Sequence, residues 1–205
     1  MLTKINRQDC ITKYPNLPLS EYNAKEDEYD FHYPKVFAIY TLTLPSKSFK
    51  GHIKLLGAEL CSLITALGFD KLIFLGDANT PWLYRDHDYP PAKEALQYLA
   101  NNKIGKRFNG GLQVDIEQLP TFIKHLAWLV RSNAVLPYVH FVDDVQNIIG
   151  NICQYGNLHI STKTKNTDTH FKTAIAACKF EYVTDGHCYN KFSKSGAIKG
   201  RTATV

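Results

Sequence analysis

Five residues in the C-terminal third have the side-chain types that metal-independent ribonucleases use. His159 and Ser161 stand two apart in "LHIST", and His187, Tyr189 and Lys191 follow in "GHCYNK". In such enzymes one neutral imidazole accepts a proton, a second imidazole donates one, and a Lys or Tyr stabilises the charge that develops on the phosphorane. The spacing does not show that these side chains converge, so a small ribonuclease or phosphoesterase stays one alternative.

The phosphoesterase alternative would need a second His-x-Ser pair. In two-histidine phosphoesterases each imidazole exchanges a proton and each hydroxyl binds a phosphate oxygen. This chain has one such pair, because His140 is followed two residues later by Val142. Residues two apart on a strand share a face, so His159 and Ser161 would point the same way. We therefore expect His159 to be a sheet histidine on the less buried face, with Ser161 beside it, rather than a catalytic base.

Acidic residues stand at three places where metal ligands could lie, but none completes a site. Asp77 ends the apolar run "LIFLGD", "RDHD" covers Arg85–Asp88, and Asp143 and Asp144 are adjacent. Turn and loop positions explain these acids without a metal. The glycines form neither a GxxxxGK nor a GxGxxG phosphate loop, and no GxSxG or Cys–His nucleophile pattern is present. The sequence thus predicts no metal and no cofactor.

The cysteines indicate a reducing compartment. Their number is odd, and no CxxC pair occurs among Cys10, Cys61, Cys153, Cys178 and Cys188, which argues against a disulfide framework and a zinc ribbon. Residues 1–30 show no signal-peptide pattern. No run approaches the roughly 20 apolar residues that cross a bilayer. We expect five free thiols in a cytoplasmic protein with no membrane partner.

The segment 78–91, "ANTPWLYRDHDYPP", concentrates aromatic and charged residues in one loop. Loops of this length are typically functional or disordered, and Trp, Tyr and Arg are common anchors of protein interfaces. Because no catalytic site is complete, elimination favours a non-catalytic binding protein of inhibitor or immunity type, such as a bacterial antitoxin that binds a toxin. The expected contact residues are Trp82, Tyr84, Arg85, His87 and Tyr89.

Charge is distributed unevenly, which leaves nucleic-acid binding as a third alternative. The net charge is +5, the segment 21–30 carries five acids and one Lys, and eight Lys or Arg follow Thr162. A basic C-terminal third can contact a phosphate backbone. The residues expected to do so are Lys191, Lys194, Lys199 and Arg201.

Hydrophobic periodicity predicts an α+β fold with a mixed β-sheet and about four helices. It opens with a β-α-β unit, which favours a parallel strand pair, and closes with a C-terminal β-meander plus helix. We expect a single domain over 1–205 with an irregular N-terminal arm over 1–34, and an extended Ile149–Tyr155 paired with Leu158–Lys163. Strands are expected at 36–44, 71–77, 110–116, 138–142, 148–155, 157–163 and 180–184, and helices at 48–67, 92–101, 119–133 and 169–178.

Overall fold

The computed structural model describes residues 2–23, 25–132, 136, 138–184, 186–196 and 198–200. Its helices are α1 (Arg7–Lys13), α2 (Phe49–Ala66), α3 (Pro90–Asn101), α4 (Leu119–Ser132) and α5 (Lys165–Ala176). The strands of the main sheet are β1 (Thr3–Ile5), β4 (Ala38–Thr43), β5 (Lys71–Leu75), β6 (Gly111–Asp115), β7 (His140–Asp143), β8 (Ile148–Ile152), β9 (Leu158–Thr162) and β10 (Glu181–Tyr182). A separate hairpin consists of β2 (Leu19–Asn23) and β3 (Glu28–His32).

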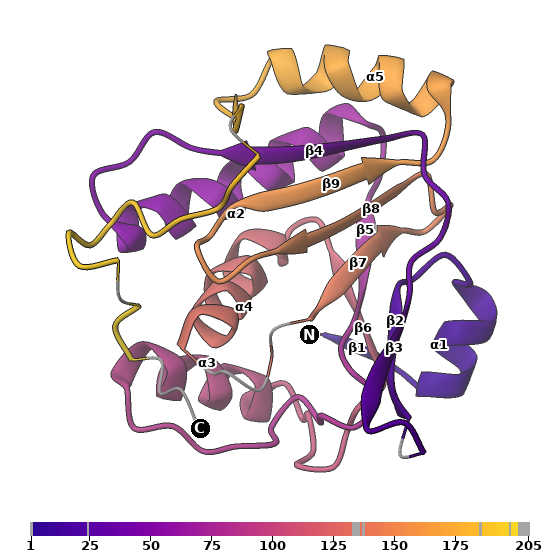
Figure 1. The fold of residues 1–205 in the computed structure, drawn as a ribbon, viewed down its shortest axis with the longest axis vertical. Coiled ribbons are helices and arrows are strands. Elements are labelled where there is room, and N and C mark those ends of the chain that lie inside the picture. Colours follow the sequence, from indigo (N-terminus) through magenta and orange to yellow (C-terminus); the bar gives the residue numbers. More distant parts are fainter. Residues whose placement is uncertain are drawn as a thin grey trace.

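The eight-stranded sheet has the order β1-β6-β5-β7-β8-β9-β4-β10, and its strand pairs are antiparallel (Figure 1). The α+β class is confirmed. The expected parallel pair is not formed, because β4 and β5 run in the same direction but have β9, β8 and β7 between them. The meander inserts between the two strands, and nothing in the sequence of either strand specifies its neighbour.

One face of the sheet, here the inner face, packs against α2, α4 and α5 and holds the main core. The helix α2 begins after Ser48, whose side chain accepts a hydrogen bond from the backbone of Gly51, and ends before Gly68, which has φ +81°. Its buried stripe recurs at helical spacing, as the sequence predicts. The stripe consists of Ile53, Leu56, Leu60, Leu63 and Ile64. No described helix is both long and apolar enough to cross a membrane.

The opposite face, here the outer face, is partly covered by the N-terminal segment. From α1 and the loop after it, Cys10, Tyr14 and Leu17 pack on Ile73 and Val142 of the sheet. The expectation of an irregular arm over 1–34 is therefore corrected: this segment contains β1, α1 and the β2–β3 hairpin. These elements have three, seven, five and five residues, too few for a hydrophobic period to be visible.

The meander is present as β7, β8 and β9. The expectation that Ile149–Ile152 is extended and pairs with the strand from Leu158 is confirmed. The following residues, Cys153–Tyr155, were expected to continue the strand but lie in the turn that closes the hairpin. Gly156 adopts φ +85° in this turn, a conformation that glycine adopts without strain.

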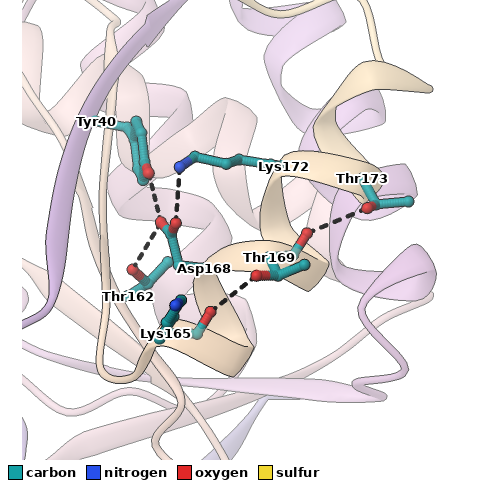
Figure 2. A network of polar contacts seen from close by, with 7 residues as sticks. All are labelled: Tyr40, Thr162, Lys165, Asp168, Thr169, Lys172 and Thr173. Carbon is teal, nitrogen blue, oxygen red and sulfur yellow. Dashed lines mark hydrogen bonds and ion pairs between the residues drawn. The ribbon is translucent and has the colours of Figure 1, made fainter.

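A buried carboxylate fastens α5 to the inner face. Asp168 accepts hydrogen bonds from the hydroxyls of Tyr40 on β4 and Thr162 on β9, and its other oxygen lies 2.8 Å from Lys172 Nζ (Figure 2). The Lys172 ammonium is the main reason why the pKa of Asp168 is lowered. The ring of Tyr40 also stacks on Phe171 at 5.0 Å. Asp168 therefore joins helix α5 to strands β4 and β9 of the sheet.

An Asp168→Ala substitution should lower the free energy of unfolding by about 1–3 kcal/mol, because two hydroxyls lose their acceptor in a buried place. Urea denaturation followed by circular dichroism measures the change. Thr169→Ala, on the exposed side of the same helical turn, is the matched control and should change stability by no more than about 0.5 kcal/mol. Equal effects of the two substitutions would contradict the anchoring role of Asp168.

Candidate functional site

A row of polar side chains crosses the outer face of the sheet. The strand register places His140, Asn151, His159 and Thr41 opposite one another on β7, β8, β9 and β4. Cys153 lies two residues beyond Asn151, and its backbone N–H donates to the carbonyl of Asn157 at 3.0 Å. Because side chains two residues apart share a face, the turn extends the polar row at its end.

A cysteine from the C-terminal segment joins this row. Cys188 Sγ lies 3.5 Å from His159 Nε2, and Asn157 Nδ2 donates a hydrogen bond to the same sulfur at 3.1 Å. The other imidazole nitrogen, Nδ1, lies 3.3 Å from Thr41 Oγ1. One ligand atom from each of Cys153, His159 and Cys188 lies within 4.8 Å of the others, the one such group of three among the described residues. We call these three residues the Cys-His-Cys cluster.

The two sulfur atoms of the cluster are not equivalent. A hydrogen bond from Cys153 lowers the pKa of Cys188, and His159 and Asn157 lower it further. The same hydrogen bond, together with burial, raises the pKa of Cys153. The two pKa shifts have opposite directions, so the thiolate form is favoured at Cys188 over Cys153. Thiolates are the form of cysteine that reacts and that binds metals.

Arg131 of α4 holds the two cysteine-bearing segments together. Its guanidinium donates to the carbonyl of Gln154 at 3.3 Å and to Asn190 Oδ1 at 3.1 Å, and lies 3.9 Å above the ring of Phe49. The side chain is buried, and no described ion pair joins it to a carboxylate. Burial lowers the pKa of Arg131, and the charges of Tyr89 and Cys153, when ionised, partly oppose this shift. The guanidinium therefore lies close enough to Cys153 to interact with its charge.

A polar pocket of about 270 Å³ adjoins the cluster. Asn157 lines the pocket and donates a hydrogen bond to Cys188 of the cluster. His187 and Tyr189 flank Cys188 in the chain and also line the pocket. Lys191 also lines it and donates to Thr43 Oγ1 at 2.6 Å and to the carbonyl of Leu44 at 2.8 Å. The full lining is Thr43, Asn157, Glu181, Tyr182, Val183, Thr184, His187, Tyr189 and Lys191.

The residues expected for a ribonuclease are therefore brought together in part. His187, Tyr189 and Lys191 share the pocket, and His159 lies beside it through its contact with Cys188. Ser161 is buried on the face of β9 that carries His159, and its hydroxyl lies 2.9 Å from the hydroxyl of Tyr33 under the β2–β3 hairpin. Ser161 is thus directed away from the pocket residues.

The residues expected to bind a protein partner are separated. Trp82 is 2% exposed, donates from Nε1 to the carbonyl of Gly110 at 2.9 Å and packs against Phe122. Tyr84 is 60% exposed, and Arg85 is exposed beside it. His87 Nε2 contacts the carbonyl of Gly200 at 2.9 Å, and the ring of Tyr89 packs edge-on against Trp128. The loop therefore does not present these five side chains as one surface.

Two basic residues expected to contact nucleic acid, Lys194 and Lys199, are exposed, and Arg201 lies outside the described residues. Lys191 is occupied by its contacts with Thr43 and Leu44. Nucleic-acid binding stays a prediction. Salt-sensitive RNA binding that is lost on replacing Lys191, Lys194, Lys199 and Arg201 would support it.

Cys153, Cys188, Asn157, Thr41 and Arg131 are site residues that the sequence does not predict. The cluster has no CxxC spacing. Its signal is a Cys and a His on either side of a glycine-containing hairpin turn, with the third ligand 29 residues further along the chain. None of the five cysteines forms a disulfide in the structure. Their free state in solution stays a prediction, which thiol titration under denaturing, non-reducing conditions tests.

Comparisons with protein-family models, with curated proteins and with solved structures found no match to this chain.

The histidine at the other end of the polar row gives a prediction about pH. His140 is buried next to the rings of Phe31 and Tyr33. Burial, and to a lesser degree His159, lower the pKa of His140 to about 4. A folded-state pKa below the unfolded value means that the unfolded chain binds the proton first as pH falls. His140 therefore destabilises the fold progressively from about pH 6.5 down to about pH 4.

Between about pH 7 and about pH 5, the unaltered protein should lose about 2 kcal/mol more unfolding free energy than the His140→Gln variant. Urea denaturation of both proteins at the two pH values measures the difference. Burial also raises the pKa of Asp143 to about 6. Asp143 therefore stabilises the fold as pH falls and partly cancels the effect of His140 in the unaltered protein. The difference between the two proteins isolates the contribution of His140. Identical pH dependence in both proteins would show that His140 is not held neutral.

Proposed function

We propose that this chain binds a divalent metal ion of the zinc class through Cys153, His159 and Cys188. The observation that carries the proposal is the mutual approach of their ligand atoms to within 4.8 Å, with 3.5 Å between Cys188 Sγ and His159 Nε2. Zinc–sulfur and zinc–nitrogen bonds of about 2.3 Å and 2.1 Å place tetrahedral ligands roughly 3.5–3.8 Å apart. Thiolate and imidazole are the ligands that zinc prefers.

The neighbours of the cluster support this assignment. Metal-binding histidines usually donate the other ring N–H to an oxygen, and Thr41 Oγ1 lies in that position on Nδ1 of His159, which leaves Nε2 for the metal. The Asn157 amide donates to Cys188 as outer partners of metal thiolates do. The buried Arg131 guanidinium interacts with the charge of the Cys153 thiolate when that group is ionised.

The number of ligands and the pocket indicate what such a metal would do. Structural zinc sites have four protein ligands, whereas catalytic sites have three and keep one position for water or substrate. The described residues supply three ligands, and the polar pocket lies beside them. We propose that the bound metal would activate water or polarise a small polar substrate in that pocket.

The test is a titration of the reduced, metal-free protein with cobalt(II), which takes the zinc position and absorbs visible light. We expect one equivalent to give the intense sulfur-to-cobalt band and the tetrahedral visible bands, and zinc to abolish both. The Cys178→Ser variant removes a half-buried cysteine of α5's C-terminal end and should behave like the unaltered protein. Absence of both bands from the unaltered protein would overturn the proposal.

A protein-binding function, the first expectation from the sequence, has a separate observation in its favour. Phe31, Phe37, Ile39 and Tyr138 are 51–68% exposed, and the ring of Phe31 lies 6.3 Å from that of Tyr138. Groups of large exposed apolar side chains often mark interaction sites. We propose that any protein partner contacts this surface and not the loop 78–91. Replacing Phe31 and Tyr138 by Ser should abolish co-purification of such a partner, and Tyr84→Ser should preserve it.

A further inference from the structure

We propose that Cys188 is a peroxide-reactive thiol and that Cys153 is its resolving thiol, so that the metal-free cluster closes reversibly to a disulfide. The oxidation needs a peroxide, the two cysteines and their neighbours, but no metal ion. Its regulatory consequence, the loss of the metal site on oxidation, rests on the function proposed above, because a disulfide sulfur no longer binds the ion as a thiolate.

The geometry supplies what a redox-active thiol needs. Such cysteines are accessible and stand next to a second thiol with which they can bond. Cys188 is held in place by a hydrogen bond from Asn157 and a contact with His159. It is only partly buried, and its chain neighbours His187 and Tyr189 line the pocket through which a small peroxide can approach. Its sulfur lies within 4.8 Å of Cys153 Sγ.

The remaining cysteines lack this combination. Cys10 is fully buried, and burial raises its pKa to about 11. Cys178 donates its S–H to the carbonyl of Ala174, and burial and Glu59 raise its pKa. Cys61 donates to the carbonyl of Ile116. Cys153 and Cys188, in contrast, lie with their sulfur atoms within 4.8 Å of each other.

The reaction with hydrogen peroxide is balanced as follows. The Cys188 thiolate attacks one peroxide oxygen, the O–O bond breaks, and hydroxide leaves with the electron pair and takes the Cys153 proton to become water. Cys188 is then a sulfenic acid. The Cys153 thiolate attacks the Cys188 sulfur, an S–S bond of roughly 2 Å forms, and the departing hydroxide takes a proton from solvent. The two sulfurs lose two electrons, which the peroxide gains, and a thiol reductant reverses the reaction.

The experiment treats metal-free protein with stoichiometric hydrogen peroxide, blocks the remaining thiols, and analyses peptides by mass spectrometry. We expect one disulfide, between Cys153 and Cys188, which dithiothreitol removes. In Cys153→Ser the reaction should stop at the sulfenic acid, which dimedone traps on Cys188. Cys178→Ser is the matched control and should form the disulfide as the unaltered protein does.

Two results would overturn the proposal: a dimedone adduct on Cys188 as the main product in the unaltered protein, or thiols of the pair that stay reduced while Cys61 or Cys178 is oxidised. The outcome is separate from that of the metal proposal, because the disulfide is measured without metal. A second arm repeats the reaction after loading with zinc. Slower disulfide formation there supports both proposals, and an unchanged rate contradicts only metal binding at this pair.

Discussion

A Cys188→Ser variant is expected to bind zinc at least about 100-fold more weakly than the unaltered protein. Serine keeps the shape of the side chain but replaces a thiolate by a hydroxyl, which is a poor zinc ligand at neutral pH. Removing an outer partner of a metal ligand typically costs 10–100-fold in affinity, so loss of a direct ligand should cost more. Competition between the protein and a chromophoric chelator measures the affinity.

Two further variants make this experiment specific. Asn157→Ala removes only the hydrogen bond to the Cys188 sulfur and should weaken binding by about 10–100-fold. Cys61→Ser removes a partly buried cysteine of α2 that donates to the carbonyl of Ile116 and is not a member of the cluster, and it should leave the affinity unchanged. The loss of zinc affinity should be largest for Cys188→Ser, smaller for Asn157→Ala, and absent for Cys61→Ser. Equal affinities for all three variants would show that zinc binds elsewhere.

The second large effect is expected at Trp82. The Trp82→Ala variant should lose about 3–5 kcal/mol of unfolding free energy, because the ring is buried against Phe122 and its removal leaves a cavity. The Gly110 carbonyl also loses the donor at 2.9 Å. Urea denaturation at neutral pH measures the loss, and if native protein does not accumulate, thermal unfolding of the conservative Trp82→Phe variant replaces it.

Tyr84 is the matched control for Trp82, since it lies in the same loop with 60% of its side chain exposed. Tyr84→Ala should alter stability by no more than about 0.5 kcal/mol. A binding experiment that replaces both residues together would therefore confuse unfolding with loss of a contact. A stable Trp82→Ala protein would contradict the buried position of the ring.

The sequence predicts the long elements well because their patterns are long enough to have a period. The 18-residue helix α2 and the 14-residue helix α4 repeat buried positions over several turns. The β8–β9 hairpin was predicted from Gly150, Asn151 and Gly156, which disfavour a helix. By contrast, α1 has seven residues and β1 has three, and their positions are set by packing on β5 and β6 rather than by local preference.

Strand order and the cluster depend on contacts between distant segments, which a local pattern does not contain. The pairing of β4 with β9 joins residues about 120 positions apart, such as Thr41 and His159. The placement of Cys188 depends on Arg131, which contacts both the hairpin turn and Asn190. An aromatic residue in a proline-containing loop is compatible with both a surface and a core position, so the loop pattern does not distinguish the two for Trp82.

The ends of the main sheet carry its shortest strands. With three residues, β1 covers only part of β6, and with two residues, β10 covers only part of β4. Each margin of the sheet thus offers a strand of another molecule only a few backbone groups, fewer than the roughly 5–6 residues of an average strand. Pairing of a further chain along β1 or β10 is consequently disfavoured, which is one of the ways in which natural sheets limit edge-to-edge aggregation.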